Sequence, residues 1–189
     1  MTEQNEDIIN LGPLAPLAGI WEGDQGIDIA PSPNRDAMET PYRERLVLEP
    51  IGQVNNHEQS LYGLRYSTMA FRIGEDSAFH EENGYWLWDG DNQQVLRCYI
   101  VPRGYSVVAG GTAEVDAKQF QMVAELGSET YGICSNKYIA EAFKTVRFDV
   151  TVTVHDQNSF SYEQDSVIQI IGVSDLFHHT DKNTLHRVG

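Results

Sequence analysis

The chain has 189 residues, of which 41% are apolar and 10% aromatic, as in a globular protein with a sizeable core. Its formal net charge is −15 at pH 7 without a cluster of Lys or Arg, which excludes nucleic acid and anionic membranes as partners. No apolar run approaches the roughly 20 residues that span a bilayer. The acidic start lacks the features of a secretory signal, which predicts a cytoplasmic protein.

The N-terminal part contains a tail, a short turn and a strand. Residues 1–10 are polar and predicted to be disordered, and two prolines limit residues 11–17 to a short helical turn or lid. Residues 19–29 are predicted to form the first strand, with glycines that indicate a close backbone approach or a bulge. The residues expected to share one face of this strand are Trp21, Ile27 and Ile29.

The rest of the chain alternates between strand-forming runs and short turns. Residues 30–41 contain three prolines and are predicted to be a loop. Residues 127–144 interrupt the strands, and there Asn136 is a candidate cap for a short helix that ends at Phe143. The final element follows Gly172. The remaining predicted strands cover residues 42–49, 59–71, 79–88, 93–101, 105–111, 119–125, 145–155 and 159–171.

About ten strands in up-and-down order predict an all-β fold, an antiparallel β-barrel of lipocalin or fatty-acid-binding-protein type with a short helical lid or insertion. A barrel of this size leaves an internal cavity for a small apolar or planar ligand. Closure requires the first and last strands to pair, so residues 19–29 and 177–187 should be neighbours. Residues 11–189 are predicted to form one domain, and the oligomeric state stays open between monomer and homodimer.

The two cysteines, Cys98 and Cys134, lack the spacing of metal ligands. In a reducing compartment such thiols usually pack as small hydrophobes. We therefore expect both to be buried and unpaired.

Three motifs resemble the nitrobindin-like, haem-binding β-barrel family, which is similar in shape to fatty-acid-binding proteins. Residues 19–23, Gly-Ile-Trp-Glu-Gly, match the start of its Gly-x-Trp-x-Gly signature, and residues 79–86 resemble its His-x-Glu-x-Gly strand. The chain also ends, like the family, with a histidine ahead of a Leu-x-Arg motif. The first signature slips after Gly23, residues 127–144 are extra, and the final spacing is longer, so the chain looks like a long subfamily.

The resemblance implies haem b in the cavity, bound through a histidine near the C-terminus, with nitric oxide binding or peroxynitrite isomerisation at the iron. His178 and His179 compete for the role of iron ligand. Adjacent strand residues point to opposite faces, so only one of them can face the cavity. We favour His179, whose neighbours Thr180 and Asp181 could orient the imidazole. The alternative is that His179 only makes hydrogen bonds within the closing strand.

A second candidate group lies in the strand at residues 79–88. His80 and Glu82 lie two residues apart and share a face with Trp88. They could form a buried polar pair that tunes the protonation of both groups, or an exposed surface pair.

Arginines and a tyrosine in or beside the central strands complete the candidate ligand-binding residues. Arg65, Arg97 and Arg103 could hold a carboxylate if they point inward, although outward arginines are commoner. Tyr66 is a candidate for the cavity lining.

Three functions are compatible with these residues. The first is a haem-binding barrel, and the second is a haem-free carrier of a fatty acid or other apolar carboxylate, anchored by an interior arginine. The third is an enzyme that acts on a small apolar substrate with His80 and Glu82 as general acid and base. The sequence has no hydrolase, phosphate-binding or zinc-protease motif, so whether the chain is an enzyme is open.

Overall fold

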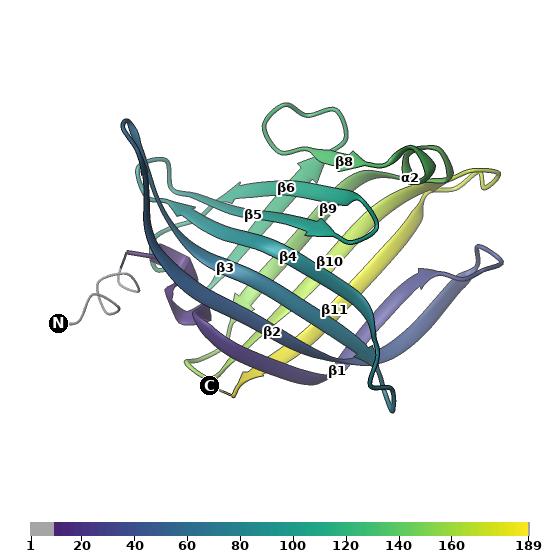
Figure 1. The fold of residues 1–189 in the computed structure, drawn as a ribbon, viewed down its shortest axis with the longest axis horizontal. Coiled ribbons are helices and arrows are strands. Elements are labelled where there is room, and N and C mark those ends of the chain that lie inside the picture. Colours follow the sequence, from purple (N-terminus) through teal and green to yellow (C-terminus); the bar gives the residue numbers. More distant parts are fainter. Residues whose placement is uncertain (1–9, 189) are drawn as a thin grey trace.

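The computed structural model describes residues 10–188, which form a closed antiparallel β-barrel of ten strands (Figure 1). An additional short strand, β8, pairs only with β6. The predicted all-β barrel is therefore confirmed. The disordered tail predicted for residues 1–10 lies, apart from Asn10, outside the described residues.

Two short helices accompany the strands, namely the 3-10 helix η1 (Gly12–Leu17) and α2 (Lys137–Ala142). The strands are β1 (Gly19–Pro31), β2 (Ala37–Asn56), β3 (Gln59–Arg72), β4 (Ala78–Asp89), β5 (Gln94–Val101), β6 (Tyr105–Thr112), β7 (Gln119–Glu125), β8 (Ile133–Ser135), β9 (Phe143–Val154), β10 (Ser159–Ile170) and β11 (Phe177–Arg187). The largest difference from the sequence prediction is β2, which begins inside the predicted loop at residues 30–41. Pro41 is tolerated there and lies opposite Ile27 of β1. Neither helix in residues 10–188 has the length and apolar character needed to cross a membrane.

The barrel closes between its first and last strands, as predicted. In the β1–β11 pair, Trp21 lies opposite Arg187 and Asp28 lies opposite Asp181. The opposite wall is less regular, because β6 and β7 share a single residue pair between Gly110 and Val123. The segment between β7 and α2, which interrupts the strand pattern of the sequence, contributes β8 as an additional partner of β6.

A bulge in β1 decides which of its residues face the interior. The pairing of β1 with β2 shifts register between Gly23 and Gly26, which confirms the predicted bulge. Trp21 before it is fully buried, whereas Ile27 and Ile29 after it are only half-buried and lie on the outer face, so the predicted shared face is wrong. The bulge reverses the alternation and turns Asp28 inward, where it is buried.

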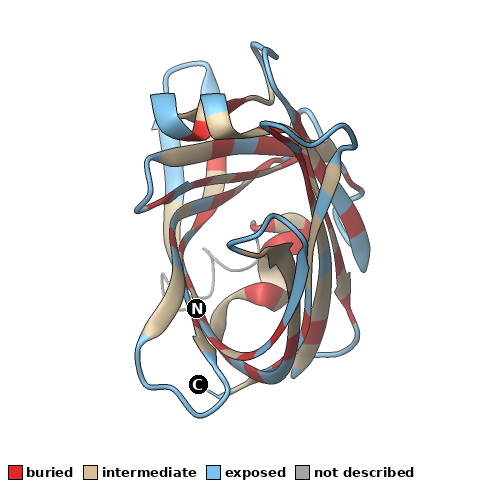
Figure 2. Cartoon of the chain, turned by 90° about the vertical axis from the view of Figure 1, so that its right-hand side faces the viewer, coloured by how far each residue is buried: buried red, intermediate tan, exposed pale blue. Residues whose placement is uncertain are grey.

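One end of the barrel is closed by η1. Trp21 Nε1 donates a hydrogen bond to the Leu17 carbonyl at 2.8 Å. The Arg187 guanidinium stacks 4.2 Å from a Trp21 ring centroid and donates to the Pro16 carbonyl at 2.8 Å. The arginine of the C-terminal motif therefore holds η1 in place. Figure 2 shows the barrel from the end opposite η1.

Both cysteines are free, as expected, but neither is fully buried. Cys98 is half-buried because it alternates along β5 with the inward residues Arg97 and Tyr99, and Cys134 in β8 is exposed. The expectation of buried thiols is therefore wrong.

Gly84 explains the glycine of the motif at residues 79–86. A Cβ atom at this position would lie 1.9 Å from the Cys98 carbonyl oxygen of β5. We expect Gly84→Ala to lower the free energy of unfolding by about 1–3 kcal/mol in urea titrations, because the β4 and β5 backbones would have to move apart. The exposed neighbour Asn83→Ala is the control, with an expected change within about 0.5 kcal/mol. Equal stability of the two variants would contradict this close approach.

Candidate ligand-binding site

A cavity of about 270 Å³ opens at the end of the barrel opposite η1. This volume lies just below the range of about 300–1,000 Å³ that is common for small-molecule sites. The apolar residues that line it are Ala30, Pro31, Val101, Ile139, Phe143 and Ile168. Ile139 belongs to α2, whose cap is Asn136 as predicted, with Ile139 N donating to Asn136 Oδ1 at 3.0 Å. The short helix therefore forms part of the cavity wall.

His179 of β11 lines this cavity, whereas His178 does not. The His179 Nε2 atom lies 2.7 Å from Asp28 Oδ1, so the carboxylate of β1 fixes the orientation of the ring. The other nitrogen of His179, Nδ1, makes no hydrogen bond with a described residue. The His178 side chain is 61% exposed on the outer face and pairs with Asp165 at 2.6 Å. Strand alternation thus places one histidine of the two in the cavity.

The polar part of the cavity is built by His80 and Glu82 of β4. His80 Nε2 lies 3.1 Å from Glu82 Oε1, and Arg97 of β5 donates to Glu82 Oε2 at 2.5 Å. The Tyr66 hydroxyl of β3 donates to the same oxygen at 2.5 Å. Glu82 is buried and both members of the pair line the cavity, so the alternative of an exposed surface pair is wrong.

These contacts set the charges in the cavity. Burial acts to raise the pKa of Glu82, but the Arg97 charge and the hydrogen bonds from His80 and Tyr66 outweigh it and lower the pKa to about 2. Burial disfavours the charged form of His80, but the hydrogen bond and negative charge of Glu82 outweigh this effect and raise the His80 pKa. Glu82 is therefore ionised at neutral pH and favours a protonated His80.

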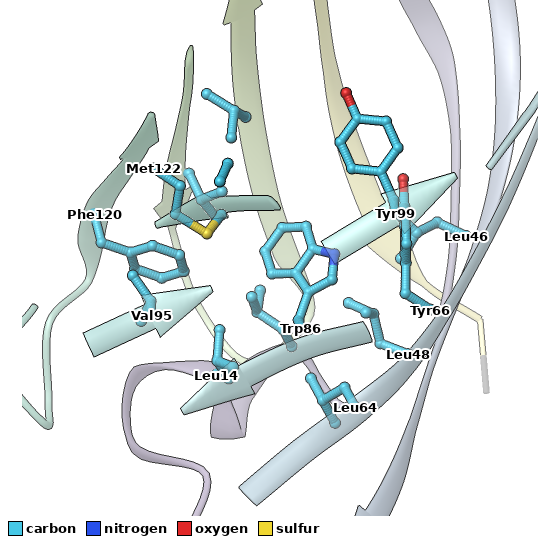
Figure 3. Close-up of a cluster of buried hydrophobic side chains, with 14 of the residues drawn as sticks. Leu14, Leu46, Leu48, Leu64, Tyr66, Trp86, Val95, Tyr99, Phe120 and Met122 are labelled. Carbon is cyan, nitrogen blue, oxygen red and sulfur yellow. The ribbon is translucent and has the colours of Figure 1, made fainter. Parts of the chain in front are cut away.

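The guanidinium of Arg97 is surrounded by aromatic rings and hydrogen-bond acceptors. Its guanidinium carbon lies 4.7 Å from the Tyr99 ring centroid, 5.2 Å from that of Tyr66 and 5.5 Å from a ring of Trp86. Figure 3 shows these three aromatic side chains in the buried cluster. Arg97 also donates to Gln164 at 3.0 Å. Both terminal nitrogens of Arg97 therefore donate within the protein, whereas its buried Nε has no hydrogen-bond partner among residues 10–188. With its terminal nitrogens engaged, Arg97 is not a free anchor for a ligand carboxylate.

Two further carboxyl groups lie deeper in the barrel. Glu44 of β2 is buried without a cation partner in residues 10–188, and burial raises its pKa against the effect of its hydrogen bonds. It accepts hydrogen bonds from Thr68 at 2.7 Å, Tyr162 at 2.8 Å and Asn183 at 3.1 Å. Asp181 accepts a hydrogen bond from Tyr42, whose hydroxyl lies 2.7 Å from that of Tyr162. The interior beyond the cavity is therefore rich in acids that share tyrosine hydroxyls.

Of the predicted ligand-binding residues, His80, Arg103 and His179 line the cavity. His178 is on the outer face, and Tyr66 and Arg97 line a separate part of the interior.

Arg65 and Trp88 lie farther from the cavity. Arg65 is on the outer face of β3, where it pairs with Glu49 at 2.6 Å, and the two side chains are 59% and 58% exposed. Trp88 is buried at the η1 end of the barrel, where its indole leaves no room for a Cβ atom on Gly12. Asp28, the partner of His179, could not be predicted from the alternation of residues in β1, because the bulge turns its side chain toward the interior.

A free metal ion has no recognisable site in the described part of the chain. Within residues 10–188, no group of three or more His, Cys, Asp or Glu side chains could hold one. A haem iron differs, because the porphyrin brings four nitrogens and the protein needs to supply only an axial ligand.

The family of THAP4-like, heme-binding β-barrel domains matches residues 10–187. The chain belongs to this family. The predicted resemblance to nitrobindin-like barrels is thereby confirmed, and membership supports a barrel that binds a small ligand. Among solved structures, Rv2717c from M. tuberculosis has a TM-score of 0.66 and 20% identity, over 93% of this chain and 95% of that chain, and so shows the same fold. A comparison with curated proteins found no match.

Proposed function

We propose that this member of the heme-binding family binds haem b in the cavity, with His179 as the iron ligand. The observation that supports this most is the position of His179, whose imidazole lines a largely apolar cavity and is oriented by the buried carboxylate of Asp28. A carboxylate that holds one nitrogen of a metal-binding histidine is a common arrangement, because it fixes the ring and raises its basicity.

The residues present suit this cofactor. The apolar wall suits a macrocycle, and Nδ1 of His179 has no hydrogen-bond partner among the residues that the structure describes. When bound, haem would supply an iron that takes a small gas such as nitric oxide, and with it the peroxynitrite isomerisation that the family resemblance implies. His80 would hold a proton in the same cavity, because Glu82 favours its charged form.

Hemin titration of the purified protein tests this proposal. We expect a shifted and sharpened Soret band for the wild type and for His178→Ala, which changes an exposed neighbour. Asp28→Asn should weaken hemin binding about tenfold, which is the smallest effect expected when a residue that orients a metal ligand is lost. His179→Ala should weaken hemin binding by more than this. No Soret change in the wild type would reject haem binding, and equal effects of His178→Ala and His179→Ala would reject His179 as the ligand.

The same purified protein distinguishes the other two hypotheses. An apolar carboxylate that co-purifies in native mass spectrometry, together with indifference to hemin, would favour the haem-free carrier. The enzyme hypothesis is supported by one observation, namely that His80 and Glu82 both line the cavity at hydrogen-bonding distance from each other. In that case His80 would transfer the proton and Glu82 would orient it.

A further inference from the structure

The positive charge of Arg103 is not paired with an acidic group in residues 10–188. Arg103 lies in the turn between β5 and β6 and lines the cavity. Its guanidinium makes no hydrogen bond or ion pair with any described residue, although the chain has a net charge of −15. Hydrogen bonds or ion pairs engage the guanidinium of each other arginine, namely Arg35, Arg43, Arg45, Arg65, Arg72, Arg97, Arg147 and Arg187.

The backbone around Arg103 is nevertheless held in place. Gly104 N donates to the Val101 carbonyl at 3.0 Å and closes the turn. Asn136 Nδ2 donates to the Arg103 carbonyl at 2.5 Å, and Asn136 also caps α2. The turn and the helix in the cavity wall are thus tied together, and Arg103 is displayed from a fixed backbone.

Tyr105 provides a second unused donor on the same segment. Its hydroxyl is buried and makes no hydrogen bond of standard geometry within residues 10–188, although the side chains of Thr145 and Tyr99 lie close enough to lower its pKa against the effect of burial. The Tyr105 side chain lines the same cavity. Buried hydroxyl groups are nearly always hydrogen-bonded, because an unpaired one costs about 1–3 kcal/mol. A buried hydroxyl and an unpaired guanidinium that line the same cavity point to a ligand that accepts hydrogen bonds from both.

The charges around the cavity favour a position beside Arg103 for an anionic group of the ligand. Glu82 is ionised within the cavity, and Glu44 and Asp181 lie deeper in the barrel. The Glu82 charge is already paired with Arg97 and His80, whereas the Arg103 charge has no ion-pair partner among residues 10–188. A ligand carboxylate beside Arg103 would therefore meet an uncompensated positive charge.

We propose that Arg103 and Tyr105 form a subsite for the carboxylate of the cavity ligand. The guanidinium would donate to the carboxylate through its planar fork of N–H groups, and the Tyr105 hydroxyl would add a third donor. This proposal rests on the proposed function insofar as it assigns the ligand to the same cavity. The propionates of haem and the carboxylate of a fatty acid share this chemistry, and the probes below separate them.

The test compares each acid with its neutral ester. Fluorescence titrations would use cis-parinaric acid and its methyl ester, and absorbance titrations would use hemin and hemin dimethyl ester. We expect Arg103→Met to weaken the binding of an acid probe about tenfold and Tyr105→Phe about threefold, with ester binding changed less than twofold. Arg65→Met is the matched control, because Arg65 is outside the cavity and should change neither affinity.

The outcomes separate the subsite from the haem proposal. The expected pattern with parinaric acid, but no Soret shift with hemin, would support the carboxylate subsite and reject haem binding. In the opposite case, hemin shifts the Soret band but Arg103→Met leaves the ratio of hemin affinity to hemin dimethyl ester affinity unchanged. That result would support haem binding and overturn the subsite. Failure of both acids to bind would overturn the subsite as well. Arg103 is exposed, so unchanged thermal unfolding of Arg103→Met would show that its effect is local.

Discussion

Replacing Arg97 with Gln should lower the free energy of unfolding by about 3–5 kcal/mol, measured by urea titration at pH 7. The substitution leaves the Glu82 carboxylate ionised and buried without the cation that now lies 2.5 Å away. It also removes the guanidinium from the aromatic rings of Tyr66 and Tyr99. Loss of one partner of a buried ion pair is costly because the remaining charge stays away from water.

Two further variants show whether the pair itself causes this loss. Arg65→Gln breaks an ion pair of similar length that is more than half exposed, and should cost less than about 1 kcal/mol. The double variant Glu82→Gln/Arg97→Gln removes both charges and should be more stable than Arg97→Gln alone. If the double variant is the less stable of the two, the ion pair is not the cause. This comparison stays informative even if Arg97→Gln is largely unfolded, because recovery by the second substitution would then be the readout.

The Arg97 pair also connects stability to the candidate site. Glu82 binds Arg97 through Oε2 and His80 through Oε1, so the buried ion pair fixes the carboxylate that orients the histidine in the cavity. A variant that loses Arg97 should therefore disturb His80 as well.

The barrel could be predicted from local patterns in the sequence. In β9, Val150 and Val152 are fully buried while Thr151 and Thr153, which alternate with them, are more exposed, and this alternation identifies one inner face. Pairing of the first and last strands follows from the need to leave no open edge. The prediction of β2 was less accurate, because prolines indicate loops even where strand pairing tolerates them.

The choice between the two C-terminal histidines was also accessible from alternation. Leu185 is fully buried, and counting back in steps of two residues gives Asn183, Asp181 and His179 on the inner face. No bulge interrupts the pairing of β10 with β11, so the count holds over the whole strand.

Other parts of the site could not be predicted from the alternation of residues along the strands. The strand β5 has apolar residues on both faces, with Val95 fully buried inside and Ile100 54% exposed outside, so its pattern does not show where Arg97 points. Asp28 faces inward only because the bulge between Gly23 and Gly26 reverses the alternation. Whether Arg103 finds an ion-pair partner within residues 10–188 depends on tertiary structure, which the pattern of strands does not give.

Asp181 should make the wild-type protein less stable as the pH rises toward neutrality. Burial, followed by the charge of Glu44, raises the pKa of Asp181 to about 7, whereas an aspartate in an unfolded chain has a pKa of about 3.9. Between these two values the folded state binds the proton that the unfolded state releases, so the free energy of unfolding falls as pH rises. The stabilising contribution is complete below about pH 4 and is lost above about pH 7.

Replacing Asp181 with Asn removes this titration and keeps an oxygen that can accept the hydrogen bond from Tyr42. Urea titrations at pH 5 and pH 8 should show that the stability of Asp181→Asn relative to the wild type increases by about 2–3 kcal/mol over this interval. The exposed Asp116→Asn removes the same charge from the surface and should show a change below about 0.5 kcal/mol. An Asp181→Asn variant whose stability follows that of the wild type at both pH values would mean that this carboxyl group is already ionised at pH 5. The acid-rich interior beyond the cavity would then hold a permanent negative charge, which would strengthen the preference of a ligand carboxylate for Arg103.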